Sequence, residues 1–282
     1  MNMGATILSS ARRLATIGFV LAAAACSGAG QAGSATSIPT EASSPVSTVT
    51  PAPSITRAPT LTSTPSPAST PTLAPQPSSV PLNAGLHAAQ VMGTGSYPGY
   101  TVVVPSGWFD YGGGGRFTIK YPNPTDQPSP VLGLSVWDVG QVFRDPCHWQ
   151  GQAVDPGRGV AALVAALVAQ PTRHATTPTD VTLAGFAGKY LEWSVPADIK
   201  SSSWTEFDAC DVTEDGDHNF ESWLGNGMGN RYQQVPGQVD RVWVLDVKGQ
   251  RLVVDATYSP DTTPTDRAEL ERVVESLRFV AP

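Results

Sequence analysis

Residues 27–80 limit most strongly what this chain can fold into. They contain ten prolines among many serines and threonines, no aromatic residue, and only Glu41 and Arg57 as charged residues. A segment with so few large apolar side chains cannot bury a core that offsets the conformational entropy lost on ordering it. We therefore expect a disordered Pro/Ser/Thr-rich linker over residues 27–90 and one globular extracytoplasmic domain over residues 91–282.

A short apolar run precedes this linker and ends at a cysteine. Residues 1–13 carry Arg12 and Arg13 and no acidic residue, and residues 14–25 are almost entirely apolar. This is the pattern of a signal peptide. Twelve residues form only about 18 Å of helix, which is too short to span a bilayer. Cys26 follows small residues, as does the lipidated cysteine of a bacterial lipobox.

Lipidation of Cys26 would attach a diacylglyceryl group, and two acyl chains suffice for stable anchoring where one does not. Ala23 stands where the lipobox prefers Leu, Val or Ile. The alternative is therefore ordinary cleavage after the alanines, which gives a secreted protein. We predict an exported lipoprotein, with residues 1–26 as its signal peptide and lipobox, anchored to the cell membrane and facing outward.

The charge of the chain excludes one class of partner. It has 17 basic and 24 acidic residues, a formal net charge of −7, and removal of the two leader arginines makes the mature chain more acidic still. Nucleic-acid binding needs a basic face that neutralises phosphates, and docking on anionic lipid needs basic clusters. We expect a monomer with no nucleic-acid partner, which meets the membrane only through its lipid anchor.

Two further cysteines, Cys147 and Cys210, lie in the part expected to fold. An even pair in an exported domain indicates a disulfide, and two free thiols are the alternative. A bridge that closes a loop of about 60 residues is expected to stabilise the domain by about 4 kcal/mol on the chain-entropy model.

The folding part alternates strand patterns with turn residues. Strands are predicted over residues 100–104, 117–121, 131–136, 181–183, 189–195, 220–224, 239–247 and 251–258. The last two form the clearest hairpin, with its turn at Lys248 and Gly249. Both faces of residues 239–247 are partly apolar, which is typical of a central strand covered on both sides.

Two helices are predicted. The first begins at Asp155 and Pro156, an acidic N-cap followed by proline at the first helical position, and its apolar residues recur at helical spacing. The second begins at Thr263 with a capping box that ends at Asp266. The pattern predicts an α+β domain with a mostly antiparallel sheet and helices packed on its faces.

Four stretches, residues 105–108, 179–190, 240–256 and 269–279, resemble the extracytoplasmic domains of actinobacterial-type surface lipoproteins with a PsbP-like (LpqN-type) fold. The resemblance covers residues 97–280 and is one of layout and turn motifs. It implies an α/β/α sandwich. Because the family is functionally diverse and mostly noncatalytic, it implies no site residues for this chain.

Catalytic signatures are absent from the sequence. It has no Gly-x-Ser-x-Gly, Cys-x-x-Cys, His-Glu-x-x-His or Walker motif, and its four histidines are scattered. A Ser/His/Asp triad assembled from distant positions remains the alternative, because such triads are defined by geometry rather than by sequence order. We predict that the protein is not an enzyme and has no resident cofactor, with Ca²⁺ as the one exception to be weighed.

The exception is an acidic stretch after Cys210. Asp211, Thr213, Asp215 and Asp217 supply closely spaced oxygen ligands, of the kind that Ca²⁺ requires. However, the position that a calcium loop gives to a bidentate acid is serine here, and no amphipathic helix flanks the stretch. The sequence favours an acidic surface turn, and a calcium site is the alternative.

Tryptophans offer a second candidate site. Five of the seven fall in or beside predicted strands and are expected in the core. Trp149 and Trp204 do not, and they lie near Cys147 and Cys210, so a disulfide would bring them to one side of the domain. We expect any ligand to bind there.

Three functions follow from these patterns. The favoured one is a noncatalytic, lipid-anchored extracytoplasmic domain that binds or senses a small molecule, a glycan or another envelope component. The alternative is a protein-interaction factor of the cell envelope without a small-molecule site. The third is a secreted hydrolase, which requires a triad that the sequence does not display.

Overall fold

The computed structural model describes residues 79–93, 99–112, 115–121, 132–227 and 229–280. Cys26, the predicted leader and residues 27–78 of the predicted linker lie outside the described residues. Among the helices that are described, none has the length and apolar character needed to cross a membrane.

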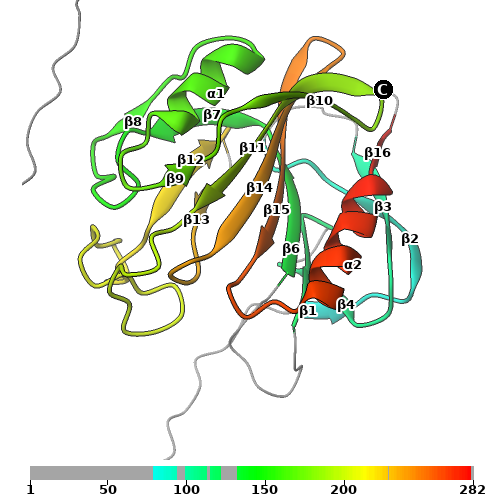
Figure 1. Cartoon of the computed structure of the whole chain (residues 1–282), viewed down its shortest axis with the longest axis horizontal. Helices are drawn as coiled ribbons and strands as arrows, with labels where there is room; N and C mark the ends of the chain where they lie inside the picture. The colour runs from blue at the N-terminus through cyan, green and yellow to red at the C-terminus, as the bar shows by residue number, and fades with distance from the viewer. Residues whose placement is uncertain (1–78, 94–98, 113–114, 122–131, 228, 281–282) are drawn as a thin grey trace, which may run out of the picture. The chain divides into compact units, whose positions relative to one another are not determined.

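A mostly antiparallel sheet of nine strands dominates the described domain (Figure 1). Along the sheet the order is β1 (Ser79–Pro81), β4 (Trp108–Tyr111), β5 (Phe117–Lys120), β6 (Leu132–Trp137), β15 (Gln250–Tyr258), β14 (Val239–Val247), β11 (Phe186–Ser194) and β10 (Thr179–Leu183). The short strand β9 (His174–Ala175) pairs with β11. This confirms the predicted mostly antiparallel sheet.

The predicted hairpin forms the centre of this sheet. Strands β14 and β15 pair over their full length, from Val239 opposite Tyr258 to Val247 opposite Gln250. Lys248 and Gly249 both have positive φ, 55° and 85°, as a two-residue hairpin turn with the right-handed twist of the strands requires. Side chains of β14 alternate between two separate hydrophobic cores, so both faces of the strand are buried.

One face of the sheet is covered by helix α2 (Pro264–Glu275) and a three-stranded sheet of β16 (Arg278–Phe279), β3 (Tyr100–Val104) and β2 (Gly85–Ala89). The helix begins as predicted, because the Thr263 side chain accepts a hydrogen bond from the Asp266 backbone amide. Leu270, Val273 and Val274 are the residues of α2 that enter the core.

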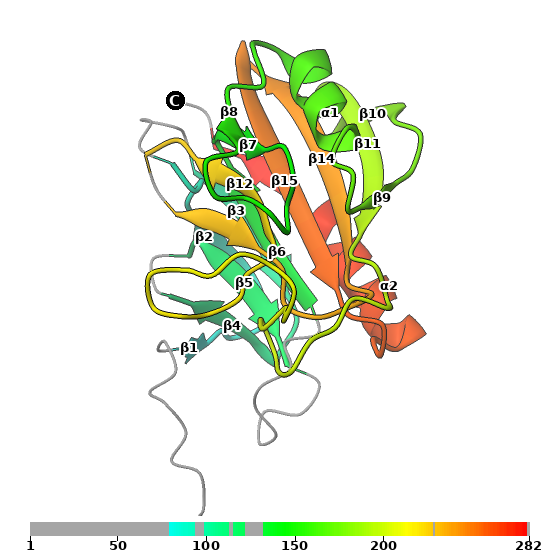
Figure 2. The same cartoon turned by 90° about the vertical axis from the view of Figure 1, so that its left-hand side faces the viewer.

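The other face is covered by helix α1 (Val160–Val168) and a four-stranded sheet of β13 (Asn230–Tyr232), β12 (Glu221–Gly225), β7 (Val139–Phe143) and β8 (Ala153–Val154). In Figure 2, α1 lies in front of β14 and β15, and α2 lies behind them. Each face therefore carries one short helix and one small sheet, so that strands supply much of the covering layers.

The predicted start of the first helix is wrong. Helix α1 begins after Gly159, which has a φ of 83°, and not at Asp155 and Pro156. The Asp155 carboxylate accepts a hydrogen bond from the Gly157 backbone amide at 2.8 Å, so it stabilises a local turn instead of capping the helix.

The described fold includes residues on both sides of the predicted domain boundary at residue 91. Strand β1 pairs with β4, and β2 pairs with β3, so residues from Ser79 onward take part in its sheets. These two strands are short and contain Pro81, Gly85 and His87, a composition that gives little strand signal.

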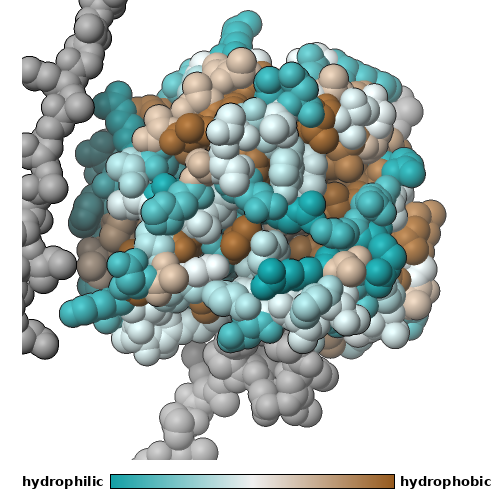
Figure 3. Space-filling view, in the orientation of Figure 1, coloured by the Kyte–Doolittle hydropathy of each residue, from teal (hydrophilic) through white to brown (hydrophobic). Residues whose placement is uncertain are grey.

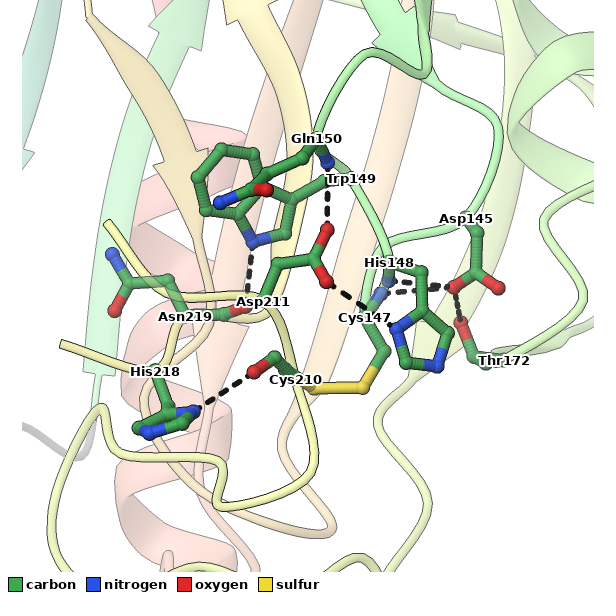
Figure 4. The surroundings of a disulfide bond; sticks show 10 residues. All are labelled: Asp145, Cys147, His148, Trp149, Gln150, Thr172, Cys210, Asp211, His218 and Asn219. Carbon is green, nitrogen blue, oxygen red and sulfur yellow. Dashed lines mark hydrogen bonds and ion pairs between the residues drawn. A yellow bond between two sulfur atoms is a disulfide. The ribbon is translucent and has the colours of Figure 1, made fainter. Parts of the chain in front are cut away.

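The predicted disulfide joins Cys147 and Cys210, with an S–S distance of 2.06 Å across 63 residues (Figure 4). It closes a small third core that contains Phe207, Phe220 and Val195. The bridge ties the long connection between β11 and β12 to the segment that follows β7.

Candidate functional site

A half-open cavity of about 240 Å³ lies against the face of the main sheet that α1 also covers. Its floor is the surface of β5, β6 and β15, and its opposite wall is formed by β13 and by Trp204, from the connection between β11 and β12. Figure 2 shows that connection, in yellow-green, passing in front of β5 and β6. The topology therefore places residues distant in sequence around one space.

The walls are mostly aromatic and aliphatic. The apolar and aromatic residues that line the space are Met92, Tyr111, Phe117, Ile119, Tyr121, Leu132, Leu134, Trp204 and Tyr232. Burial raises the pKa of Tyr111 to about 12, and the neighbouring tyrosines Tyr232 and Tyr121 contribute to the shift. The Tyr111 hydroxyl therefore stays protonated in the physiological pH range.

A single charged residue, Arg231 on β13, lies among the described residues that line the cavity. Its guanidinium is held by the two central strands: Nε donates to Asp255 Oδ2 on β15 at 2.5 Å, and Nη2 donates to Asp240 Oδ1 on β14 at 2.9 Å. Nη2 also donates to the Thr257 hydroxyl at 2.8 Å, and Nη1 donates to the Tyr232 carbonyl. These hydrogen bonds connect the four-stranded sheet to the main sheet.

A second arginine extends the network away from the cavity. Arg173 Nη1 donates to Asp240 Oδ2 at 3.3 Å, and its guanidinium carbon lies 3.7 Å from the centre of the Trp193 ring. Ser222, Gln233 and Gln238 add hydrogen bonds around the four charges, and the buried Arg173 Nε has no partner among the described residues. Two arginines thus face two aspartates, and the network carries no formal net charge when all four are ionised.

The network shifts the pKa values of its members in the directions that burial predicts. Burial raises the pKa of Asp255 to about 6, and the charge of Asp240 adds to this shift while Arg231 opposes it. Burial also lowers the pKa of Arg173 to about 10 against the attraction of Asp240. For Arg231 burial is outweighed, because the charges of Asp255 and Asp240 raise its pKa.

Trp204 supplies a polar group without a partner. Its indole Nε1 is buried, and within the described ranges no acceptor lies in hydrogen-bond distance of it. Leaving a buried donor unsatisfied costs about 1–3 kcal/mol. Because Nε1 itself is buried, Trp204 lines the cavity with its other atoms.

The two tryptophans that were predicted to share a site have different surroundings in the structure. Trp204 lines the cavity, whereas Trp149 does not. Trp149 packs edge-on against Phe143, with 6.0 Å between ring centres, and its Nε1 donates to the Asn219 carbonyl at 2.9 Å. It lies beside the disulfide, as Figure 4 shows, where it supports the loops that the bridge joins.

The predicted calcium ligands lie in the same region. Asp211 Oδ2 accepts a hydrogen bond from the Gln150 amide at 2.8 Å, and its Oδ1 lies 3.5 Å from His148 Nδ1 (Figure 4). The Thr213 hydroxyl accepts a hydrogen bond from the Asp217 amide. Within the described ranges, no group of three or more His, Cys, Asp or Glu residues is placed to hold a metal ion, Asp215 included. Calcium binding stays a prediction that a titration can test.

Sequence reasoning missed the buried network and most of the cavity wall. One signal was present for the acids: Asp240 and Asp255 occupy positions of β14 and β15 that share a face with buried valines. No comparable signal identifies Arg231, because β13 is only three residues long and the acids that Arg231 binds lie on strands of another sheet.

A second depression, of about 600 Å³, lies beside the cavity and is more open. Its lining consists mainly of glycines and short polar residues around Asn226, and it shares Gly229 and Asn230 with the cavity. Figure 3 shows one face of the domain, on which apolar residues reach the surface in separate patches among polar ones. The mostly apolar cavity of about 240 Å³ has the better defined chemistry, and we take it as the candidate site.

No family model and no curated protein matches this chain. Among solved structures, it is similar to cyanobacterial PsbP (CyanoP) from Synechocystis, with 13% identity over 70% of this chain and 94% of that chain, at a TM-score of 0.32. It is also similar to LpqN of Mycobacterium tuberculosis, described as involved in cell envelope biogenesis, with 11% identity over 72% of this chain and 91% of that chain, at a TM-score of 0.29. These two proteins are of the PsbP and LpqN types that the sequence resemblance names, and likeness at this level assigns no activity, ligand or partner.

Proposed function

We propose that this protein is an exported, lipid-anchored envelope protein whose noncatalytic domain, a PsbP-like α/β/α sandwich, binds a small molecule in the cavity between the main sheet and β13. The observation that carries the proposal is the cavity itself. It is half-open and mostly apolar, and Arg231 is the one charged residue among the described residues of its wall. Pockets of this composition, with a few placed polar groups, are the usual form of small-molecule sites.

The leader supports the location. Cys26 stands at the end of the predicted signal peptide, and the long Pro/Ser/Thr-rich linker that follows would hold the domain away from the membrane. Labelling of the protein in growing cells with a radioactive fatty acid tests the anchor. The label is expected in the wild-type protein and not in Cys26→Ser, and labelling of both would refute the assignment.

Thermal unfolding tests ligand binding. The full chain, with its disulfide intact, is unfolded in the presence of a panel of metabolites, glycan fragments and divalent ions. A ligand at 100 times its dissociation constant stabilises the folded state by about 2.7 kcal/mol, an increase of several degrees in Tm for a domain of this size. A ligand that raises the Tm of the wild-type protein, and not of a variant whose cavity is filled, would support the proposal.

One observation favours the alternative, a protein-interaction factor of the envelope. Leu86 on β2 and Val103 on β3 lie directly opposite each other in the strand register, and they are 68% and 47% exposed. Exposed apolar pairs of this kind are common in protein interfaces. Cross-linking on intact cells would distinguish the two functions: an envelope protein captured by the wild type and lost with Leu86→Ser would support the alternative.

A further inference from the structure

We infer that the chain's own linker occupies this cavity, with residues 71–77 docked across it as a polyproline II helix. This 71–77 stretch lies outside the described residues and is followed, after Ser78, by the first strand. The inference goes beyond the proposed function, because the occupant belongs to the same chain and a small molecule would have to displace it. It follows from the aromatic lining of the cavity, from the place where the linker enters the fold, and from the sequence of the linker.

The lining of the cavity is of the kind that binds proline-rich segments. Five aromatic residues line it: Tyr111, Phe117, Tyr121, Trp204 and Tyr232. Aromatic-lined grooves bind polyproline II segments because such a segment is already extended before it binds, so that little conformational entropy is lost on docking. The cavity is half-open, and a chain can therefore lie across it with side chains entering the space.

The linker joins the domain at the wall of this cavity. Ser79, the first residue of β1, lies opposite Tyr111 of β4 in the strand register, and Tyr111 lines the cavity. Opposite residues of an antiparallel pair have Cα atoms about 4.5–5.5 Å apart and side chains on the same face of the sheet. The residues that precede Ser79 therefore begin beside the cavity, on the strand next to one of its lining residues.

The 71–77 stretch is long enough to cross the cavity floor. Strand β15 lies three strands from β4, beyond β5 and β6. Neighbouring strands lie about 4.8 Å apart, so the distance to cross is about 14 Å. A polyproline II helix rises about 3.1 Å per residue, so about five residues span this distance. Residues 73–77 supply that length, and Ser78 would form the turn onto the sheet.

The sequence of the stretch suits an apolar space. It reads Pro71-Thr72-Leu73-Ala74-Pro75-Gln76-Pro77. Pro71, Ala74 and Pro77 recur at every third residue, so they share one face of a helix with three residues per turn. No residue from 58 to 78 is charged. The one charged residue among the described lining residues, Arg231, already bonds to two buried carboxylates. Docking therefore removes no unpaired charge from water.

The cavity wall also offers donors for the backbone of the stretch. A polyproline II helix has no internal hydrogen bonds, so its carbonyl oxygens need other partners. Tyr111 and Tyr232 are only half-buried, but burial still raises the pKa of Tyr111 to about 12 and raises the pKa of Tyr232. Both hydroxyls therefore stay protonated at physiological pH, and each can donate a hydrogen bond to a carbonyl oxygen.

Docking is tested by NMR of the full chain, with its disulfide intact and its tyrosine rings isotope-labelled. The ring signals of Tyr111 and Tyr232 are identified by their loss when each residue is replaced by phenylalanine. We expect the double variant Pro71→Ser/Pro77→Ser to shift both ring signals from their wild-type positions, because it removes two proline rings from the docked face.

A matched control is Pro65→Ser/Pro67→Ser, which changes the same number of prolines earlier in the linker and should leave both ring signals in place. A synthetic peptide of residues 69–78 gives a second readout by competition. If the peptide binds with a Kd of about 0.1 mM and the tethered stretch has an effective concentration of about 1 mM, the peptide should bind the wild type about tenfold more weakly than Pro71→Ser/Pro77→Ser.

Filling the cavity locates the binding. Gly133 lines the cavity, and a Cβ atom there would lie 3.9 Å from its nearest neighbours, so the position accepts a side chain. Gly133→Leu would place a side chain in the space. Added to Pro71→Ser/Pro77→Ser, it should abolish binding of the peptide, and peptide binding that survives it would place the 71–77 stretch elsewhere on the domain and overturn the inference.

The remaining outcomes are equally decisive. If Pro71→Ser/Pro77→Ser leaves both tyrosine signals unchanged, or if Pro65→Ser/Pro67→Ser shifts them as much, the linker does not dock as inferred. If the difference between the wild type and Pro71→Ser/Pro77→Ser disappears on dilution, the occupant is the linker of a second copy, and the inference is wrong. A small molecule that raises the Tm would still support the proposed function in each of these cases.

Discussion

Replacement of Arg231 by methionine tests whether the buried network holds the two sheets together. Methionine keeps much of the length of the side chain and removes the charge. Two buried carboxylates would then lose their shared cation: Asp255 is 1% exposed and Asp240 is fully buried. The one remaining positive neighbour would be Arg173, which lies 3.3 Å from Asp240. Removing one partner of a buried ion pair costs about 3–5 kcal/mol, since it leaves an uncompensated buried charge. We therefore expect Arg231→Met to lose about 3–5 kcal/mol at pH 8.

The assay is equilibrium urea unfolding of the full chain with its disulfide intact, in which the midpoint and the slope together give the free energy of unfolding. A matched control is Arg241→Met. Arg241 pairs with Glu271 at 3.1 Å, but the Glu271 side chain is 54% exposed, and surface pairs of this kind contribute at most about 1 kcal/mol. If the two variants lose the same free energy, the network does not stabilise the fold in the way described.

The dependence of this loss on pH provides a second check. Arg231 lowers the pKa of Asp255, which burial nevertheless raises to about 6. Without the arginine the pKa of Asp255 lies higher still, so the folded variant takes up a proton at a pH where the wild type does not. The difference in free energy of unfolding should therefore shrink as the pH falls below neutrality and level off below about pH 6. A difference that stays constant between pH 8 and pH 5 would refute the charge argument. If Arg231→Met does not fold at pH 8, the double variant with Asp255→Asn should regain stability, because it removes one of the uncompensated charges.

Three further predictions concern stability. The folded-state pKa of Asp255 is raised from 3.8 to about 6, so the contribution of this residue to the free energy of unfolding falls by about 3 kcal/mol as the pH rises between these two values, and it is constant at higher pH. Urea unfolding should show this pH dependence in the wild type and not in Asp255→Asn. Replacing both disulfide cysteines by serine should cost about 4 kcal/mol, and a reducing agent should lower the Tm of the wild type to that of the variant. Gly188→Ala should cost about 1–3 kcal/mol by urea unfolding, because the new Cβ would lie 2.1 Å from a β14 carbonyl oxygen, whereas Gly133→Ala, with 3.9 Å of clearance, should be nearly neutral.

The parts of the fold that could be predicted from the sequence are those set by local interactions. The β14–β15 hairpin follows from an alternating pattern and from Lys248 and Gly249, whose positive φ values suit the turn. Helix α2 follows from Thr263 and Asp266, which form its cap within a few residues. The disulfide was also predicted, because an exported domain with two cysteines has one way to pair them.

The parts that could not be predicted depend on contacts between distant segments. Strand β13 has three residues, and it belongs to a different sheet from the hairpin that follows it. Nothing local in Arg231 and its neighbours indicates that the strand will lie across β15. Helix α1 shows the opposite error, because a local signal was present and misled the prediction. Asp155 resembles an N-cap, but Gly157 and Gly159 adopt positive φ, so the helix begins only at Val160.

The buried acids lie between these two cases. A turn at Lys248 and Gly249 places Asp240 opposite Thr257 and Val242 opposite Asp255, so the hairpin register alone puts both carboxylates on the face that carries Val242. If that face is buried, as the apolar residues of β14 indicate, two ionised carboxylates cannot remain there without cations, because an unpaired buried charge is too costly. The sequence therefore contains enough information to require that Asp240 and Asp255 be either protonated or paired with positive partners. It does not identify them, since that choice depends on how the four-stranded sheet docks. The same docking places Trp204 opposite β5 and β6, which explains why the cavity can be described only once the tertiary structure is known.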